Sequence, residues 1–455
     1  MILNHIKKFS SSVAFIDEQY NQIKYFEIIK LNKKIKNFIK KKSIIFIISE
    51  NTLGSLLGYS SLAMTDSLLV PINHDISFKN FEIFQNSYQP HYLWCEENFL
   101  RKKFKKFFFP ILKYKKYCLC INKYKKNFFI NDKLKLLLST SGSLGEPKCV
   151  KLSFTNINHN IKSIDKYLKI NQSDRTITNL AWNYSYGLSI VNMHLNKGAS
   201  LVVTKKTLFD KKFWELYDKF KITNFNGVPF TFEILKKLKL KRIFNSKIRF
   251  ITQAGGKMNP LLSKEITKLC KENKILFYSM YGQTEASPRM SYIEKTSEET
   301  KASCIGKSVS GGKFYLVDKK NKKIKKSHIS GELVYQGKNV FVGYCKNYKD
   351  LKKKDEKKNI LKTGDLAFYD NKKNYYLTGR KSRFVKIFGV RISLETIEDK
   401  LKLNNIDCAA ILKEENLFIF IEKKNKKNEM DKIISKILKI RTNDFYLEYV
   451  NNFPR

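Results

Sequence analysis

Residues 137–151 read LLSTSGSLGEPKCVK. An apolar run ends here in small hydroxylated residues and glycines, and Lys148 follows them. Glycines let backbone N–H groups approach an anion closely, and hydroxyls and an ammonium group add further donors. The stretch therefore predicts a phosphate-binding loop that follows a strand. Its spacing, Gly142-x-x-Gly145-x-x-Lys148, differs from the G-x-x-x-x-G-K-[ST] loop of common nucleotide hydrolases, and taken alone it is also compatible with a solvated turn.

The segments on either side of this loop alternate between strand and helix patterns. Residues 43–48 and 67–71 predict strands, residues 55–64 predict a buried helix between them, and residues 14–17 and 23–26 predict a hairpin. Strand, helix and strand in that order favour a parallel α/β sheet. The same alternation recurs after the loop, at residues 176–180, 191–196, 200–203 and 213–220.

The last quarter of the chain has a different secondary-structure pattern. From about Gly331 the sequence consists of short strand patterns separated by turns, and from residue 393 it predicts helix, strand, strand and helix. We expect a large domain over residues 1–380 and a small α+β domain over residues 381–455.

Two further motifs carry reactive side chains. Residues 281–286 read YGQTEA directly after a strand pattern at residues 276–279, and ligand sites in α/β sheets gather at the carboxyl ends of strands. An aromatic ring can stack on a base, a hydroxyl can reach a phosphate, and a carboxylate can hold Mg²⁺. Asp365 and, fifteen residues later, Arg380 form the third motif, because a carboxylate accepts hydrogen bonds from a ribose diol well.

In this order, the motifs resemble the adenylate-forming superfamily, which includes acyl-CoA synthetases, aryl-CoA ligases, luciferases and the adenylation domains of nonribosomal peptide synthesis. The resemblance spans nearly the whole chain. It includes ENTLGSLLGYSSLAMTDSLLVPINHDIS at residues 50–77, NYSYGLS at 183–189, NGVP at 226–229, QAGGKM at 253–258 and TGDLAFYDNKKNYYLTGRKSRFVKIFGVRISLETIE at 363–398. It implies an α/β fold, with a large N-terminal domain of parallel and mixed sheets packed with helices, a small distorted β-barrel, and a small α+β C-terminal lid domain.

The resemblance also implies roles for individual residues. The catalytic residues would be Thr284 at the α-phosphate, Glu285 as the Mg²⁺ ligand, and Lys148. The residues expected to bind ATP are Thr140, Ser141 and Gly142 in the phosphate loop, Gly255, Gly256 and Tyr281 at the adenine, and Asp365 and Arg380 at the ribose. The residues expected to line the acyl pocket are Asn183, Tyr184, Tyr186 and Gly227. Lys386 and Gly389 would lie on the loop that enters for thioester formation.

The expected reaction has two halves. A carboxylate attacks the α-phosphorus of ATP and pyrophosphate leaves, with Mg²⁺ and cationic donors stabilising the developing charge. The small domain then rotates, and a thiol of CoA or of the phosphopantetheine on an acyl carrier protein takes the acyl group. The partners implied are a small carboxylic acid and CoA or a carrier protein. Residues 183–186 offer no carboxylate for an α-amine, which favours a neutral acyl, aryl or hydroxy acid over an α-amino acid.

The sequence departs from the family pattern at one catalytic position. The family's P-R-T-x-x-G-K segment supplies a lysine for adenylation, and here the residues that match its start are Pro454 and Arg455, where the sequence stops. Loss of one charge-stabilising donor costs roughly 10²–10³-fold in rate. Three alternatives account for this departure: a truncated reading of the sequence, substitution by a neighbouring lysine, or drift of the protein toward another task. An alternative function is therefore a catalytically weakened adenylate-fold protein that binds nucleotide or a partner.

Composition limits the remaining classes. The 455 residues include 88 Lys and Arg against 41 Asp and Glu, a formal net charge of +47, with 42% hydrophobic residues. The lysines are spread along the chain without a nucleic-acid motif, so a basic nucleic-acid-binding protein is the weaker alternative, and the charge favours anionic ligands. No signal peptide or membrane-spanning run is evident, and the eight cysteines lack C-x-x-C spacing, which predicts a cytoplasmic protein with reduced thiols.

Overall fold

The computed structural model describes residues 3–100, 104–139, 148–238, 240–244, 247–297, 303–381, 384–387, 390–413, 416–422, 429–438, 441–451 and 453. The chain divides into two compact units. Unit 1 contains residues 1–302, 307–313 and 336–361, and unit 2 contains residues 303–306, 314–335 and 362–455. The boundaries between these units differ from the expected domain boundary after Arg380, which stays a prediction.

One sheet of unit 1 carries the strand that leads into the phosphate-loop sequence. In sheet order its strands are β20 (Gly343–Cys345), β9 (Cys149–Ser153), β8 (Leu134–Ser139), β4 (Leu68–Asn73), β3 (Ile44–Ser49), β5 (Tyr92–Glu96), β7 (Tyr117–Asn122) and β6 (Phe108–Tyr114). Strand β3 pairs in parallel with both β4 and β5. All six of its residues are buried, as expected for a continuous apolar run covered on both faces. The predicted parallel α/β arrangement is confirmed.

The helix between β3 and β4 is α2 (Leu53–Ala63), and it is almost entirely buried. The residue before it, Thr52, caps its N-terminus, because the Thr52 side chain accepts a hydrogen bond from the Ser55 backbone N–H. Gly58 is required inside this helix, because a Cβ there would lie 1.9 Å from Nε1 of Trp94 on β5. The sequence SLLGYSSLAM therefore specifies both the helix and its close approach to the sheet.

A second group of strands in unit 1 carries the YGQTEA motif. Their order is β15 (Arg289–Glu294), β14 (Leu276–Gly282), β13 (Phe250–Gln253), β12 (Asn224–Gly227), β10 (Arg175–Ile177), β11 (Ser200–Val202), β1 (Val13–Ile16) and β2 (Gln22–Lys24). Strands β12, β13 and β14 run parallel. The predicted N-terminal hairpin is confirmed as β1 and β2, but its second strand is short because Tyr25 already begins helix α1 (Tyr25–Phe38).

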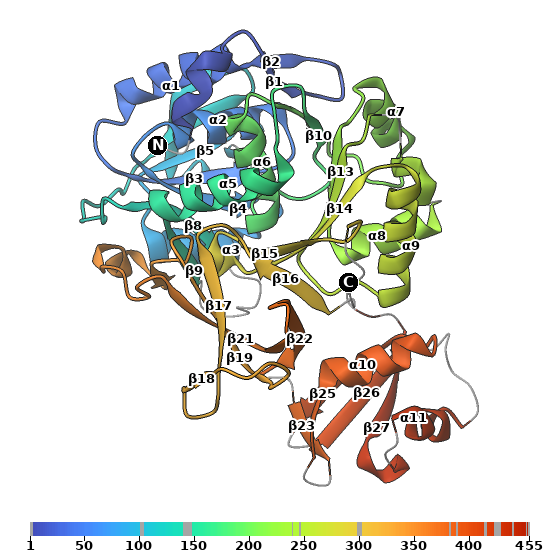
Figure 1. Cartoon of the computed structure of the whole chain (residues 1–455). Coiled ribbons are helices and arrows are strands. Elements are labelled where there is room, and N and C mark those ends of the chain that lie inside the picture. Colours follow the sequence, from blue (N-terminus) through green and yellow to red (C-terminus); the bar gives the residue numbers. More distant parts are fainter. Residues whose placement is uncertain are drawn as a thin grey trace. The chain divides into compact units, whose positions relative to one another are not determined.

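The two faces of these parallel strands differ in chemistry, since side chains alternate along each strand. One face presents Phe225, Ile251 and Phe277 to a core shared with α7 (Lys211–Lys219), α8 (Pro229–Lys237) and α9 (Pro260–Glu272). In Figure 1 helices α8 and α9 lie beside β13 and β14. The other face presents polar residues to α5 (Phe154–Leu168) and α6 (Ser185–Asn196), for example Thr252, which hydrogen-bonds Tyr186 of α6. The polar face is the one that builds the candidate site.

Unit 2 contains antiparallel strands and a small α+β module. The first sheet has the order β18 (Lys323–Ile324), β17 (Gly312–Val317), β19 (Gly331–Gly337), β21 (Ile360–Tyr369) and β22 (Tyr375–Arg380). The module contains the hairpin of β23 (Phe384–Ile387) and β24 (Val390–Ser393), then α10 (Leu394–Leu403), β25 (Cys408–Lys413), β26 (Asn416–Glu422), α11 (Met430–Leu438) and β27 (Tyr446–Val450). The predicted helix–strand–strand–helix order is confirmed. Strand β27, which pairs in parallel with β26, was not predicted.

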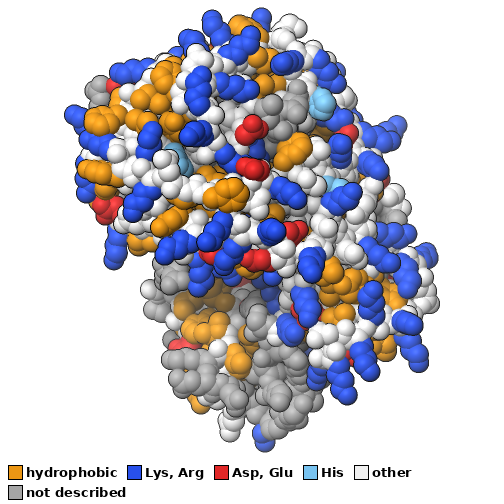
Figure 2. Space-filling model, turned by 90° about the vertical axis from the view of Figure 1, so that its left-hand side faces the viewer, with side chains coloured by type: hydrophobic (Ala, Val, Ile, Leu, Met, Phe, Trp, Pro, Cys, Tyr) orange, Lys and Arg blue, Asp and Glu red, His pale blue; other side chains and the backbone are white. Residues whose placement is uncertain are grey.

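Short elements complete the chain: η1 (Asn4–Phe9), α3 (Phe78–Tyr88), α4 (Glu97–Phe99), η3 (Leu240–Ile243), η4 (Thr284–Ala286), β16 (Cys304–Ser308), η5 (Tyr348–Lys352) and η7 (Thr442–Asp444). Within the described residues, no helix has both the length and the apolar character needed to cross a lipid bilayer. Figure 2 shows Lys and Arg side chains scattered over the viewed face, between apolar and neutral groups.

Candidate active site

Glu285 and Lys148 meet at one aromatic ring. Glu285 lies on η4, which follows the carboxyl end of β14, and Lys148 directly precedes β9. The Tyr344 phenol on β20 donates a 2.9 Å hydrogen bond to Oε1 of Glu285, and Nζ of Lys148 lies 3.7 Å from the centroid of the Tyr344 ring. Burial, and secondarily the Glu285 charge, raises the pKa of Tyr344, so its phenol stays protonated and remains a donor. Two of the three predicted catalytic residues therefore converge, through a tyrosine that the motifs did not single out.

Thr284 contacts the start of α6. Its Oγ1 and Oγ of Ser185 form a hydrogen bond of 3.1 Å. The next residue, Tyr186, forms a 2.8 Å hydrogen bond with Thr252 of β13, and the Thr252 hydroxyl donates to Oδ1 of Asn226 at 2.6 Å. Hydrogen bonds thus connect polar side chains of α6, β13 and β12, and the first residue of α6 contacts Thr284.

The residues expected at the adenine lie just beyond two parallel strands. Gly255 follows β13 with a φ of 88°, in the left-handed region that favours glycine. The carbonyl of Gly256 accepts a 2.7 Å hydrogen bond from Nε2 of Gln253, which fixes the turn. Tyr281 lies near the end of β14, two residues past Ser279, the register partner of Gln253. These three residues occupy adjacent strand ends, as ligand sites of α/β sheets do.

The acyl-pocket residues occupy different environments. Asn183 is buried, at 8% exposure, whereas the Tyr184 side chain is half exposed. Tyr186 is buried within the polar network, and its side chain contacts the backbone of Gly227 at the end of β12. The four residues therefore differ in exposure, and their shared role in an acyl pocket stays a prediction.

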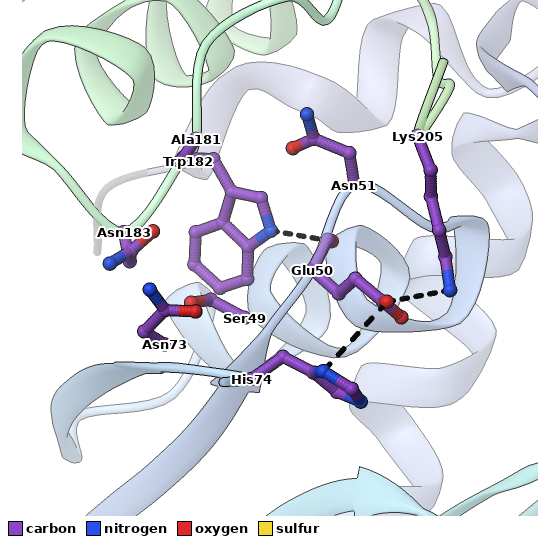
Figure 3. A pocket seen from close by; sticks show the side chains of 9 residues that line it. All are labelled: Ser49, Glu50, Asn51, Asn73, His74, Ala181, Trp182, Asn183 and Lys205. Atoms are coloured by element: carbon purple, nitrogen blue, oxygen red, sulfur yellow. Dashed lines mark hydrogen bonds and ion pairs between the residues drawn. The ribbon is translucent and has the colours of Figure 1, made fainter. Parts of the chain in front are cut away.

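Asn183 lines a pocket of about 210 Å³ at the carboxyl ends of β3 and β4 (Figure 3). The lining residues are Ser49, Glu50, Asn51, Asn73, His74, Ala181, Trp182, Asn183 and Lys205. The Glu50 carboxylate lies between two nitrogens, 2.6 Å from Nζ of Lys205 and 4.0 Å from Nδ1 of His74. Four other lining residues, Glu50, Asn51, Asn73 and His74, lie in the motif at residues 50–77, but only Asn183 was assigned a role from the sequence. Polar residues directly after two buried strands were a usable signal.

Asp365 and Arg380 lie in unit 2 and are paired. They are register partners on β21 and β22, and Nε of Arg380 donates to Oδ1 of Asp365 at 3.0 Å. The Asp365 side chain is 6% exposed and that of Arg380 is 60% exposed. Gly364 has a φ of 75°. Its carbonyl accepts a hydrogen bond from the Lys381 N–H, and this bond holds the two strands together beside the pair. The expected ribose pair is therefore held in place by backbone pairing.

Four of the predicted site residues lie outside the residues that the structure describes: Thr140, Ser141, Gly142 and Gly389. Lys386 lies on β23, opposite Arg391 of β24.

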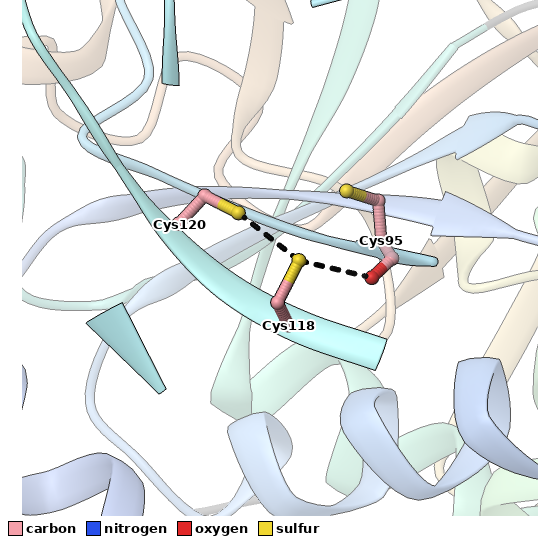
Figure 4. A group of neighbouring side chains, drawn as sticks. All are labelled: Cys95, Cys118 and Cys120. Carbon is pink, nitrogen blue, oxygen red and sulfur yellow. Dashed lines mark hydrogen bonds between the residues drawn. The ribbon is translucent and has the colours of Figure 1, made fainter. Parts of the chain in front are cut away.

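Three cysteines form a cluster on neighbouring strands (Figure 4). Cys95 of β5 is the register partner of Cys118 of β7, and Cys120 lies two residues further along the same strand. All three are buried, their sulfurs lie within 4.8 Å of one another, and Sγ of Cys118 lies 3.3 Å from Sγ of Cys120. Hydrogen bonding to the Cys118 sulfur raises the pKa of Cys95 and of Cys120. Among the described residues, this is the one group of three or more His, Cys, Asp or Glu side chains close enough to hold a metal ion together. Thiolates are ligands that suit soft metals.

Comparison with known proteins extends the sequence resemblance. The chain is 24% identical over 432 residues to bacitracin synthase 1 of Bacillus licheniformis, covering 91% of this chain and 8% of that protein. It is 27% identical over 291 residues to 4-coumarate–CoA ligase CCL1 of Humulus lupulus, covering 62% and 53%. The chain thus spans about one-twelfth and one-half of the lengths of these relatives.

Solved structures agree on the fold. The o-succinylbenzoate coenzyme A synthetase of Bacillus subtilis, in complex with ATP and magnesium ion, superposes with a TM-score of 0.78 at 17% identity, over 99% of this chain and 96% of that one. The expected α/β adenylate-forming fold is therefore confirmed. The sequence model of the AMP-binding enzyme family matches residues 39–345, about two thirds of the chain and including Lys148, Thr284, Glu285 and Tyr344. This chain belongs to the AMP-binding enzyme family.

Proposed function

We propose that this protein uses ATP to convert a carboxylic acid into an acyl-adenylate with release of pyrophosphate, and then transfers the acyl group to a thiol. The observation that carries the proposal is the convergence of Lys148 and Glu285 on Tyr344 beside the Thr284–Ser185 contact. A cation, a carboxylate and hydroxyl groups held together at a strand end suit the binding of a metal-bound polyphosphate.

The donor set fits a magnesium ion at Glu285. Mg²⁺ is held in proteins by one or two carboxylates, with phosphate oxygens and waters as its other ligands. Glu285 offers a carboxylate whose orientation is fixed by the Tyr344 phenol. When bound, Mg²⁺ neutralises charge on the phosphates. Lys148 would add a second positive charge at the leaving pyrophosphate, and Thr284 would donate to the α-phosphate.

In the first half-reaction a carboxylate oxygen of the acid forms a bond to the α-phosphorus, and the bond to the bridging oxygen of pyrophosphate breaks. Asp365 and Arg380 would bind the ribose, and Gly255, Gly256 and Tyr281 the adenine. In the second half-reaction a thiol attacks the acyl carbon, AMP leaves, and Lys386 and Gly389 would line the path of the thiol. CoA and a carrier-protein phosphopantetheine present the same thiol chemistry.

The test is pyrophosphate release with MgATP and a panel of fatty, aryl, hydroxy, dicarboxylic and amino acids, with and without CoA. Glu285→Gln and Asp365→Ala serve as controls. We expect release that depends on one class of acid and falls by about 10²–10³-fold in Glu285→Gln. ATP binding without release for any acid would overturn the proposal.

A further inference from the structure

Arg289 is a buried cation at the start of β15. Its side chain is 3% exposed, and its Nε has no hydrogen-bond partner. Its carbonyl accepts hydrogen bonds from Nδ2 of Asn160 at 3.0 Å and of Asn339 at 2.8 Å, so its backbone is held firmly. Within the described parts of the chain, no carboxylate forms an ion pair with it.

A buried arginine without an anion is unusual. The guanidinium group stays charged under all conditions in which proteins are folded, and a buried charge is normally paired. Its aromatic neighbours do not supply the missing charge. Burial raises the pKa of both Tyr167 and Tyr186, and the nearby guanidinium only partly opposes this, so both phenols remain neutral. The counter-ion of Arg289 is therefore not among its described neighbours.

The guanidinium has one face against an aromatic ring and a buried Nε without a hydrogen-bond partner. Its central carbon lies 4.1 Å from the centroid of the Tyr186 ring, so the ring covers its face. The Nε without a partner lies on the edge of the planar group. That edge is the part that binds a carboxylate through two parallel hydrogen bonds.

Arg289 also lies beside the proposed reaction site. It is the register partner of Gly282, two residues before Thr284. Tyr186 follows Ser185, which hydrogen-bonds Thr284. The polar network from Tyr186 through Thr252 to Asn226 continues along the same side of the strands. A molecule with one carboxylate at Thr284 would therefore extend its other end toward Arg289 and Tyr186.

We propose that the acid activated by this protein carries a second carboxylate, and that Arg289 binds it. This inference rests on the proposed function and narrows its substrate class to dicarboxylic acids. It also differs from the expectation of a neutral acid, which was drawn from residues 183–186 alone. A phosphate of ATP presents similar anionic chemistry, and the kinetic constants for ATP and for the acid distinguish the two sources.

The experiment compares matched acids in acid-dependent ATP–pyrophosphate exchange: succinate with butyrate, glutarate with valerate, and phthalate with benzoate. We expect the wild-type protein to use one dicarboxylate of these pairs with a kcat/KM at least about 100-fold above that of its monocarboxylate partner. In Arg289→Met this preference should be lost, with little change in the KM for ATP. Arg289→Lys should retain part of it, because the charge stays while the bidentate edge is lost.

The outcomes separate the two proposals. If wild-type protein uses the monocarboxylates better, or if Arg289→Met raises the KM for ATP and leaves acid preference unchanged, the role of Arg289 is overturned while acid activation stands. If no acid supports exchange, the proposed function fails. Calorimetric titration of the dicarboxylates into wild-type and Arg289→Met protein then decides the binding role. Equal or absent binding in both proteins would overturn it, and thermal unfolding verifies that the variant is folded.

Discussion

The phenol of Tyr344 donates a 2.9 Å hydrogen bond to the carboxylate of Glu285, and it comes from a strand 59 residues further along the chain. The Phe341 N–H reinforces this arrangement by donating to the Glu285 carbonyl at 2.8 Å. The proposed magnesium ligand is therefore oriented from two sides by the segment that contains β20.

Removing the Tyr344 hydroxyl should weaken metal use. In Tyr344→Phe the Glu285 carboxylate keeps its charge but loses the donor that orients it, and changes of this kind cost roughly 10–100-fold in metal affinity or activity. We expect exchange activity to fall and the Mg²⁺ concentration for half-maximal activity to rise. Tyr348→Phe, the same change on nearby η5, is the matched control. An unaltered Mg²⁺ dependence in Tyr344→Phe would show that Glu285 is not the metal ligand.

Asp365→Asn should affect nucleotide binding more than stability. Arg380 is largely exposed, so its ion pair with Asp365 contributes about 0–1 kcal/mol to folding. We expect the KM for ATP to rise by roughly 10-fold, since a charge-assisted hydrogen bond contributes about 1.5–3 kcal/mol. Asp318→Asn changes a turn aspartate of the same unit and should leave the KM unchanged. Equal KM values in both variants would remove Asp365 from the ribose site.

Burial of Lys135 should make stability depend on pH. Its Nζ donates to the carbonyls of Thr65 and Ser67, and burial lowers its pKa to about 7. An unfolded lysine has a pKa of about 10.4, so between these values the unfolded state binds more protons, and stability rises with pH by up to about 1.4 kcal/mol per unit. Below pH 7 both states are protonated and the penalty is complete.

The comparison is with Lys135→Met in guanidinium unfolding at several pH values from 6.5 to 9.5. We expect the variant to be more stable than wild type at the low end, with the difference shrinking as the pH rises. Parallel pH profiles for the two proteins would contradict the lowered pKa.

The cysteines give a test of the core. Seven of the eight are buried in the structure, and Cys408 is partly exposed. We expect a thiol reagent such as Ellman's reagent to label one thiol rapidly in the native protein and all eight after unfolding. Cys408→Ser should abolish the rapid phase. Rapid labelling of Cys95, Cys118 or Cys120 in the native state would show that their cluster is accessible.

The sequence predicted the local architecture well where patterning is strong. The buried run of β3, helix α2, and the helices α10 and α11 with strands β25 and β26 of the C-terminal module all follow from apolar periodicity. Strand β27 was missed because none of its residues, Tyr446–Val450, is fully buried, so it lacks a continuous apolar run. Its pairing partner, β26, supplies the information that its own sequence lacks.

The site could be predicted only where a motif is contiguous. Glu285 and Lys148 lie in such motifs, whereas Tyr344 becomes a functional candidate through its contact with Glu285, 59 positions away. Ser185 lies in the motif at residues 183–189, but its contact with Thr284 depends on the fold. The Cys95–Cys118 neighbourhood likewise depends on strand register, which spacing along the chain does not reveal. Nothing in the sequence distinguishes Arg289 from the other basic residues, because its burial depends on the fold.

The most direct test of acyl-adenylate formation follows one oxygen atom. The protein is incubated with MgATP, CoA and an acid that supports exchange, labelled with ¹⁸O in its carboxylate, and the AMP is analysed by mass spectrometry. If the carboxylate attacks the α-phosphorus, one carboxylate oxygen remains on AMP, which gains a single ¹⁸O. Unlabelled AMP, or label found in inorganic phosphate together with ADP, would contradict the account.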